Sequence, residues 1–325
     1  MIIVTGGAGF IGSALIAALN KRQITDILVV DELGTDRKWK NLRNLSFTDY
    51  VEKADFLEMV IEDKLDNSVE SVFHLGACSD TTETNASYLI KNNYEYSKLL
   101  AQWVTDADIH FIYASSAATY GDGSTGFSDD QEKIEILRPL NMYGYSKHLF
   151  DLWARRTGLL KKIVGLKYFN VFGPNEYHKA DMRSFCIKAF EQITTAGKVR
   201  LFKSYKPEYA DGEQLRDFIY VKEAVDMTLF FYDNPKLSGL FNIGSGKART
   251  WNGLVKAVFA AMGKEPNIEY IEMPESIRNQ YQYYTCADIT NLRKAGCDKE
   301  TTSLEEAIKD YVQNYLQKDR YLTGT

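Results

Sequence analysis

The chain has 325 residues, of which 45% are hydrophobic and 26% are charged, and its formal net charge at pH 7 is −5. This composition is ordinary for a globular protein, and the length favours two lobes over a single hydrophobic core. The acidic balance disfavours a general nucleic-acid binder, and no apolar run approaches the roughly 20 residues that span a bilayer.

Four cysteines are scattered along the chain, without a Cys-x-x-Cys pair or a histidine spacing that suits zinc. We interpret them as free thiols in a reducing compartment and expect no metal site. The N-terminus lacks the charged and apolar regions of a secretory signal. The expected location is therefore the cytoplasm, with neither nucleic acid nor membrane as a partner. The cysteines are Cys78, Cys186, Cys286 and Cys297.

The first half of the chain alternates short apolar segments with longer helical ones, which is typical of a parallel sheet covered by helices on both faces. We predict a Rossmann-type, doubly wound α/β fold with a smaller mixed α/β substrate lobe. The expected strands are residues 1–5, 27–31, 49–52, 71–76, 110–115 and 162–168, and the expected helices are 11–21, 56–64, 87–106 and 140–160.

Beyond Pro174 the pattern loosens. We place the cofactor domain at residues 1–174, with a return near 215–247, and the substrate lobe mostly at 175–325. The tail after Lys318 is expected to be frayed. The expected helices are 184–196, 222–232, 250–262, 288–295 and 304–317, the strands are 217–221 and 240–243, and a loop is expected at 203–214.

A glycine fingerprint, Gly6-x-x-Gly9-x-x-Gly12, lies between the first strand and the first helix. The first glycine permits a tight turn, the second lets the backbone approach a pyrophosphate, and the third allows close helix packing. The helix N-terminus adds free N–H groups and a positive dipole end. We therefore predict a dinucleotide site here.

Asp31 ends the second strand, where a carboxylate can bind the ribose hydroxyls of adenosine. It favours NAD, because it repels a 2′-phosphate. Arg37, Lys38 and Lys53 can offset that charge and hold the extra phosphate of NADP. Lysines are, however, commonly solvated surface charges. The residues alone leave NAD and NADP open.

Tyr143 and Lys147 lie four residues apart, so on a helix they share one face. We expect the lysine cation to favour the phenolate and to lower the tyrosine pKa from about 10. Ser116 offers a hydroxyl that can hydrogen-bond the phenol and a substrate oxygen. These groups predict proton transfer at a carbinol while a nicotinamide exchanges a hydride. The alternatives are a surface pair, or a non-catalytic dinucleotide-binding regulator.

The order of the glycine fingerprint, Ser116, Tyr143 and Lys147 resembles the extended short-chain dehydrogenase/reductase family over essentially the whole chain. The resemblance implies that Tyr143 is the acid/base, that Lys147 also binds the nicotinamide ribose, and that Ser116 orients the reacting oxygen. Most members act on nucleotide-linked sugars. Ala117-Ala118-Thr119 stands where dehydratases carry an Asp-Glu pair, so dehydration is disfavoured.

Longer segments are similar to the ADP-heptose 6-epimerases within that family. The likeness implies inversion of the exocyclic sixth carbon of ADP-D-glycero-D-manno-heptose, which yields a lipopolysaccharide core precursor. It also implies NADP as the cofactor and a homo-oligomer, by likeness a homopentamer. An epimerase or reductase of a UDP- or dTDP-hexose is the alternative. The similar segments are 76–79, 114–121, 140–147, 168–174, 178–179, 216–221, 241–246 and 281–282.

Epimerisation without net redox passes through a ketone that must turn over before the hydride returns to its opposite face. The oxygen points to different places in the two orientations, so two acid/base groups are useful. Tyr143 serves one orientation, and Lys179 matches the family's second acid/base group. Burial near other cations is expected to lower the Lys179 pKa. The alternative roles of Lys179 are phosphate binding or a plain surface charge.

The likeness also implies ligand contacts: Asn170 with the sugar, Arg216 with the diphosphate as a bidentate fork, and Tyr281 with either. Asp181 and Lys188 replace the usual serine and histidine, and Leu75 replaces a usual glutamate, which affects the expected substrate specificity. The implied substrate contacts are Ser116, Asn170, Asp181, Lys188, Leu201, Phe202, Lys203, Ser204, Arg216 and Tyr281. The implied cofactor contacts are Gly6, Gly9, Phe10, Ile11, Gly12, Asp31, Glu32, Lys38, Lys53, Leu75, Gly76, Ala77, Cys78, Ser79, Asn92, Lys147, Val171 and Lys179.

Overall fold

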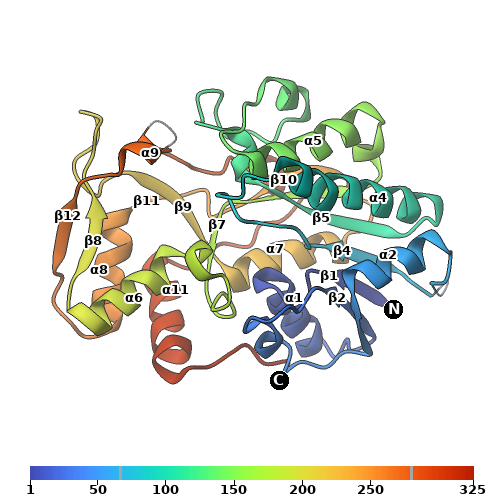
Figure 1. Ribbon diagram of the computed structural model, residues 1–325, viewed down its shortest axis with the longest axis horizontal. Coiled ribbons are helices and arrows are strands. Elements are labelled where there is room, and N and C mark those ends of the chain that lie inside the picture. The colour runs from blue at the N-terminus through green and yellow to red at the C-terminus, as the bar shows by residue number, and fades with distance from the viewer. Residues whose placement is uncertain (66–67, 279–280) are drawn as a thin grey trace.

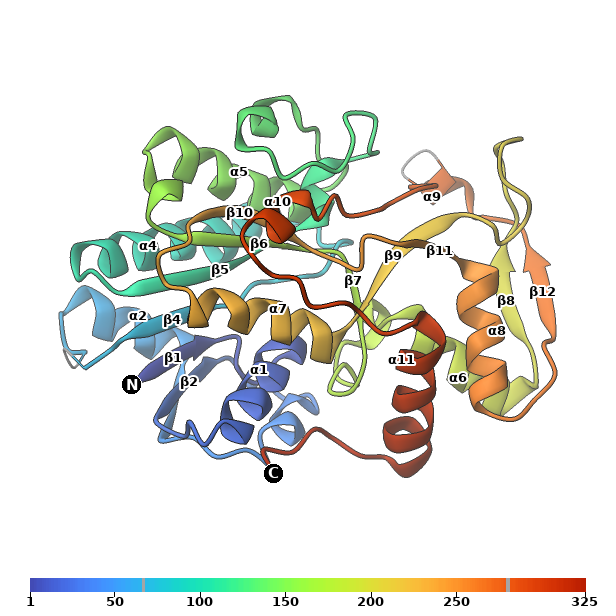
Figure 2. The same ribbon diagram turned by 180° about the vertical axis from the view of Figure 1, so that it is seen from behind.

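The computed structural model describes residues 1–65, 68–278 and 281–325 (Figures 1 and 2). Its larger lobe is a seven-stranded parallel sheet in the order β10-β6-β5-β4-β1-β2-β3. The predicted Rossmann-type fold is confirmed. The strands are β1 (Ile2–Thr5), β2 (Ile27–Asp31), β3 (Asp49–Glu52), β4 (Ser71–His74), β5 (His110–Ser116), β6 (Val164–Tyr168) and β10 (Gly239–Ile243).

Helices cover both faces of this sheet because its strands are apolar on both sides. Side chains alternate along a strand, so Ile2 and Val4 of β1 enter the core under α1 and α7, while Ile3 enters the core under α2, α4 and α5. A π-helical turn, Ile90–Glu95, joins α3 to α4. The helices are α1 (Phe10–Lys21), α2 (Lys53–Ile61), α3 (Ala86–Leu89), α4 (Tyr96–Asp106), α5 (Met142–Arg156) and α7 (Val221–Asp233).

The smaller lobe contains a three-stranded sheet, β11-β9-β7, and a two-stranded parallel sheet, β12-β8 (Figure 2). The sequence did not indicate β7, β8, β11 or β12, which are only three or four residues long and half exposed. The strands are β7 (Asn170–Phe172), β8 (Val199–Phe202), β9 (Leu215–Tyr220), β11 (Ala248–Thr250) and β12 (Ile268–Ile271). The helices are α6 (Phe185–Ala196), α8 (Trp251–Ala261), α9 (Glu275–Arg278) and α11 (Leu304–Asp310), whereas α10 (Thr290–Lys294) packs against β10 of the large sheet (Figure 2).

The chain after residue 215 visits both lobes. β9 lies in the three-stranded sheet, whereas β10 pairs with β6 at the edge of the large sheet. The return to the large lobe is therefore made by α7, which covers one face of the sheet, and by β10, which pairs at its edge.

The expectation of a frayed tail after Lys318 is wrong. Tyr321 and Leu322 are buried, and the backbone N–H of Leu322 donates to Asn175 Oδ1 at 2.9 Å. The Tyr321 ring meets Tyr177 edge to face, with centroids 4.9 Å apart. The C-terminus consequently lies beside α1 (Figure 1). Two apolar side chains hold this segment, because their burial offsets the entropy of ordering a terminus.

All four cysteines are free thiols, as expected, and Cys186 and Cys297 are buried. In the described ranges, no helix is both long and apolar enough to traverse a bilayer. The same residues contain no group of three His, Cys, Asp or Glu side chains placed to hold a metal ion.

Candidate active site

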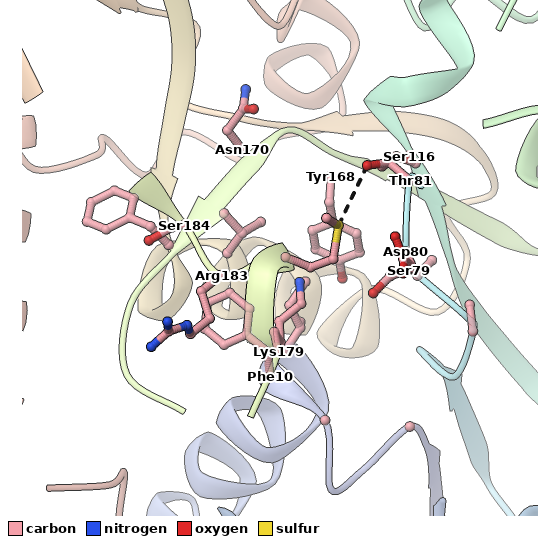
Figure 3. Close-up of a pocket in the computed structure, with 18 of the residues that line it drawn as sticks. Phe10, Ser79, Asp80, Thr81, Ser116, Tyr168, Asn170, Lys179, Arg183 and Ser184 are labelled. Carbon is pink, nitrogen blue, oxygen red and sulfur yellow. Dashed lines mark hydrogen bonds between the residues drawn. The ribbon is translucent and has the colours of Figure 1, made fainter. Parts of the chain in front are cut away.

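A cavity of about 810 Å³ opens at the carboxyl ends of the parallel strands (Figure 3). It lies where β1 has β2 on one side and β4 on the other, the point at which the strand order reverses. Ligands of open α/β sheets bind at such points. The walls come from the glycine fingerprint, the ends of β4, β5 and β6, helix α5, and residues 173–184, which we call the β7–α6 loop.

The glycine fingerprint forms an open cradle on one wall. Gly6 has a left-handed φ of 69°, and a Cβ there would lie 2.6 Å from the backbone nitrogen of Gly76. A Cβ on Gly12 would lie 2.1 Å from the carbonyl oxygen of Gly6. Any side chain at these positions would push the loop away from β4 and α1, so the close approach requires glycine.

Two lysines pair with two successive carboxylates at the end of β2. Asp31 accepts hydrogen bonds from Ala8 N at 2.9 Å and from Lys38 Nζ at 3.0 Å. Lys53 Nζ lies 2.5 Å from Glu32 Oε2. These groups line a second cavity of about 220 Å³ that shares Gly6 and the end of β4 with the first. All the cofactor contacts implied by the resemblance line one of these two cavities.

Ser116, Tyr143 and Lys147 meet in the main cavity. Ser116 ends β5, and α5 begins after Asn141, whose side chain accepts from Gly144 N at 2.8 Å and caps the helix. The Ser116 hydroxyl hydrogen-bonds to Tyr143. Lys147 is 4% exposed, and its Nζ donates to the carbonyl oxygen of Ala114 at 2.8 Å. The helix thus places the pair as its spacing indicated.

The expected lowering of the Tyr143 pKa by Lys147 is wrong for this arrangement. Burial raises the pKa of Tyr143, and the hydrogen bond from Ser116 is the influence that lowers it. The ammonium of Lys147 is directed at a backbone carbonyl instead. Its own pKa is lowered to about 8 by burial, against the opposing charge of Asp151.

Lys179 enters the cavity from the β7–α6 loop (Figure 3). Its Nζ lies over the Phe10 ring, 5.6 Å from the centroid. Burial lowers the pKa of Lys179, as predicted, while the charge of Glu176 opposes the shift. Asn170, at the start of β7, also lines the cavity, and its amide donates to the carbonyl oxygen of Asp217 at 3.0 Å.

The β7–α6 loop also touches the opposite wall. Thr81, which follows β4, donates from Oγ1 to Met182 Sδ at 3.6 Å, the contact drawn as a dashed line in Figure 3. Lys188 lines the cavity and donates to the carbonyl oxygen of Asp181 at 2.7 Å. The Asp181 side chain is exposed and lies outside the cavity lining.

A third, mostly apolar cavity of about 600 Å³ lies between α6, α8, β8 and β12. Leu201, Phe202 and Tyr281 line it. The Arg216 guanidinium stands beside it, between the rings of Trp251 and Tyr281, at 5.6 and 5.2 Å from their centroids. It donates to two backbone carbonyls, so its planar fork is held in one orientation.

Four predicted substrate residues lie outside the linings of these cavities: Asp181, Lys203, Ser204 and Arg216. Lys203 Nζ pairs with Glu272 Oε1 at 2.7 Å, and the backbone N–H of Ser204 donates to Asp211 Oδ1 at 2.7 Å. The Lys203 side chain is therefore directed at Glu272, and the Ser204 hydroxyl donates to the carbonyl oxygen of Lys206 at 2.9 Å.

Sequence reasoning missed a buried ion pair behind the catalytic helix. Lys167 Nζ lies 2.7 Å from Asp151 Oδ2 and 2.7 Å from Thr119 Oγ1, and both charged side chains are almost fully buried. Two signals were present: a lysine inside an apolar strand, and an aspartate one turn after Lys147. Trp251, which lines both the main and the apolar cavity, was also missed, because nothing in its local sequence marks it.

Comparison with known proteins places the chain among sugar-nucleotide enzymes. It matches the NAD dependent epimerase/dehydratase family over residues 2–244. It is 56% identical over 316 residues to the ADP-L-glycero-D-manno-heptose-6-epimerase of Nitratidesulfovibrio vulgaris, covering 97% of this chain and 98% of that one. It is 48% identical to the protein of that name from Fusobacterium nucleatum, covering 99% and 100%. The Helicobacter pylori crystal structure of that name has a TM-score of 0.81 at 28% identity, covering 96% and 95%.

Proposed function

The chain belongs to the NAD dependent epimerase/dehydratase family, and we propose that it converts ADP-D-glycero-D-manno-heptose into ADP-L-glycero-D-manno-heptose. The observation that carries this proposal is the 56% identity to an enzyme of that name along nearly the whole of both chains. The cavity supports it, since Ser116, Tyr143, Lys147 and Lys179 all line it.

The residues present fit a nicotinamide dinucleotide, whose ring takes up and returns a hydride when bound. Gly6 and Gly12 keep the fingerprint open, and the start of α1 directs its N–H groups toward the cavity. Asp31 is held rigidly at the end of β2 by the N–H of Ala8. This chain is therefore an epimerase that uses such a cofactor.

The protein's own residues handle the protons. Tyr143, acting as the phenolate, takes the proton of the hydroxyl oxygen on the sixth carbon of the sugar as the hydride leaves that carbon, and Ser116 orients the oxygen by hydrogen bonding. Lys179 enters from the opposite loop and donates a proton to the oxygen when the ketone is reduced on its other face. Its lowered pKa keeps the proton easier to transfer than that of an exposed lysine.

We infer that the cofactor is NADP rather than NAD. Lys38 and Lys53 both lie at the end of β2, where they offset Asp31 and Glu32. Each can turn from its carboxylate toward a 2′-phosphate, which carries more charge than a single carboxylate. Denaturing the purified protein and identifying the released dinucleotide by mass spectrometry tests this inference. Released NAD would contradict it.

The proposed reaction is tested with the purified protein and ADP-D-glycero-D-manno-heptose. Proton NMR should show the L-glycero epimer appearing until the two epimers reach equilibrium, without net consumption of cofactor. UDP-galactose serves as the comparison substrate and should remain unchanged. No conversion of the heptose, together with turnover of UDP-galactose, would overturn the proposal in favour of a hexose epimerase.

A further inference from the structure

One buried carboxylate ties the β7–α6 loop together. Glu176 is 1% exposed. Its Oε1 accepts hydrogen bonds from Gly173 N at 3.2 Å, Ser184 Oγ at 2.7 Å and Tyr311 Oη at 3.0 Å, and its Oε2 accepts one from Ser184 N. Gly173 and Ser184 are the two ends of the loop, and Tyr311 directly follows α11. A single side chain thus closes the loop and attaches it to the helical layer.

The same residue supports the backbone of Lys179. The N–H of Lys179 donates to the carbonyl oxygen of Glu176 at 3.0 Å, and Met182 N donates to the carbonyl oxygen of Lys179 at 2.8 Å. These bonds form the turn from which the Lys179 side chain reaches over the Phe10 ring. The direction of that side chain therefore depends on where Glu176 is held.

A second anchor ties the loop to the cofactor domain without using the carboxylate. Asn175 Nδ2 donates to Ser13 Oγ at 2.9 Å, and Asn175 Oδ1 accepts from Leu322 N. The backbone carbonyl oxygen of Asn175 accepts from Asn41 Nδ2 at 3.1 Å. These bonds remain when Glu176 is replaced. A conservative replacement should therefore perturb the loop without detaching it.

Burial raises the pKa of Glu176, and the hydrogen bonds from Ser184 and Gly173 oppose that rise because they stabilise the carboxylate form. Both Glu176 oxygens face backbone N–H groups, which can only donate, and the two hydroxyls are placed to donate as well. The negative charge raises the pKa of Lys179, against the effect of burial. The other charged or titratable groups lining the cavity around Lys179 are Asp31, Asp36, Lys38, Cys78, Asp80, Tyr143, Lys147, Tyr168, His178, Arg183 and Lys188.

We propose that Glu176 is the positioning residue for Lys179, which it serves by clamping the β7–α6 loop and by supplying a countercharge to the lysine ammonium. The inference rests on the proposed function only for the proton-transfer role of Lys179. The place and the charge of Lys179 are measurable without turnover.

The test is the pH dependence of Lys179 acetylation by acetic anhydride in the folded full-length protein, measured by peptide mass spectrometry. The exposed Lys264 is the internal standard. In the wild type the midpoint for Lys179 should lie below that of Lys264, because burial disfavours the ammonium. Glu176→Gln keeps the size of the side chain and removes its charge, so the midpoint should fall further, by roughly one pH unit.

Turnover gives the second readout. For Glu176→Gln the kcat of epimerisation should fall about 10- to 100-fold while KM changes little, since the substrate contacts remain and the proton donor is misplaced. Tyr311→Phe removes one of the four donors and should lower kcat by a smaller factor. This second variant keeps the test decisive if Glu176→Gln folds poorly.

The matched control is Glu132→Gln, the same chemical change in an exposed carboxylate that pairs with Arg155. It should leave the Lys179 midpoint and kcat unchanged. If Glu176→Gln and Tyr311→Phe both behave like this control, the proposal is overturned. A wild-type protein that fails to epimerise the heptose would instead contradict the proposed function, and the acetylation result would still decide the role of Glu176.

Discussion

The two sides of the cavity hold their proton-transfer groups by different means. Tyr143 and Ser116 stand on α5 and β5, regular elements whose backbone bonds are made within the large sheet and its helices. Lys179 stands in the β7–α6 loop. This loop is not paired with a strand, and hydrogen bonds of side chains, chiefly those of Glu176 and Asn175, hold it in place.

This difference separates two ways of building a site. On the sheet side, spacing along one helix brings Tyr143 and Lys147 together, and the buried charge of Asp151 on the same helix raises the pKa of Lys147 against the effect of burial. On the loop side, geometry depends on polar partners that are distant in sequence, since Tyr311 lies 135 residues from Glu176. The sheet side should tolerate polar changes in distant elements better than the loop side.

The largest expected effect comes from removing either acid/base group. Tyr143→Phe and Lys179→Met should each lower the kcat of epimerisation by about 10²- to 10⁴-fold, because each removes one proton transfer. Tyr145→Phe on the exposed face of α5 and Lys264→Met are the matched controls and should retain the wild-type rate. Steady-state assays with the heptose substrate measure these rates. A wild-type rate in either site variant would contradict the proposal that Tyr143 and Lys179 transfer protons from opposite sides of the cavity.

The buried ion pair behind α5 should be the most sensitive point for stability on the sheet side. Lys167→Met leaves Asp151 buried without its cation, although Tyr113 and Ser115 still donate to it. Breaking such a pair costs about 3–5 kcal/mol of unfolding free energy. Urea denaturation measures the loss. Lys133→Met, which removes an exposed pair, should change it by less than about 1 kcal/mol. If Lys167→Met and Lys133→Met lose the same unfolding free energy, the buried ion pair contributes no more to stability than the exposed one.

Burial of Lys147 makes the stability of the sheet side depend on pH. Its folded pKa of about 8 lies below the ordinary lysine value of 10.5, so the buried ammonium destabilises the fold below pH 8. The penalty diminishes as pH rises from about 8 to 10.5, because the folded state loses this proton before the unfolded chain does.

The wild type should therefore gain about 2 kcal/mol of unfolding free energy relative to Lys147→Met between roughly pH 7 and pH 10. Urea titrations of both proteins at each pH measure this difference, in which the other lysines cancel. A difference that does not change with pH would mean that Lys147 keeps an ordinary pKa in the folded protein.

The smallest effect is expected at the end of β2, which belongs to neither side of the comparison. Lys38→Ala and Lys53→Ala should each weaken NADP binding by about tenfold and leave NAD binding nearly unchanged, since a partly exposed cation contributes about 1 kcal/mol to a phosphate contact. Calorimetric titration with each dinucleotide measures the ratio. Equal weakening of both dinucleotides would assign these lysines to the shared pyrophosphate or to the loop structure.

Features that depend on residues close together in the sequence were predictable. The alternation of strands and helices predicted the parallel sheet, and the glycine fingerprint predicted the cradle before α1. The four-residue spacing placed Tyr143 and Lys147 on one face of α5. In each case neighbouring residues decide the outcome, because helix and strand periodicity set which side chains share a face.

Features that depend on distant partners were decided only by the tertiary structure. The sequence alone could not show that β8 pairs with β12, that Arg216 lies between two aromatic rings, or that the C-terminal tail is buried. It also misled on the Tyr143 pKa, because the Lys147 ammonium turns to a backbone carbonyl and burial dominates the phenol. Burial and hydrogen-bond partners come from segments far apart in the chain, and they determine charge states that residue spacing cannot.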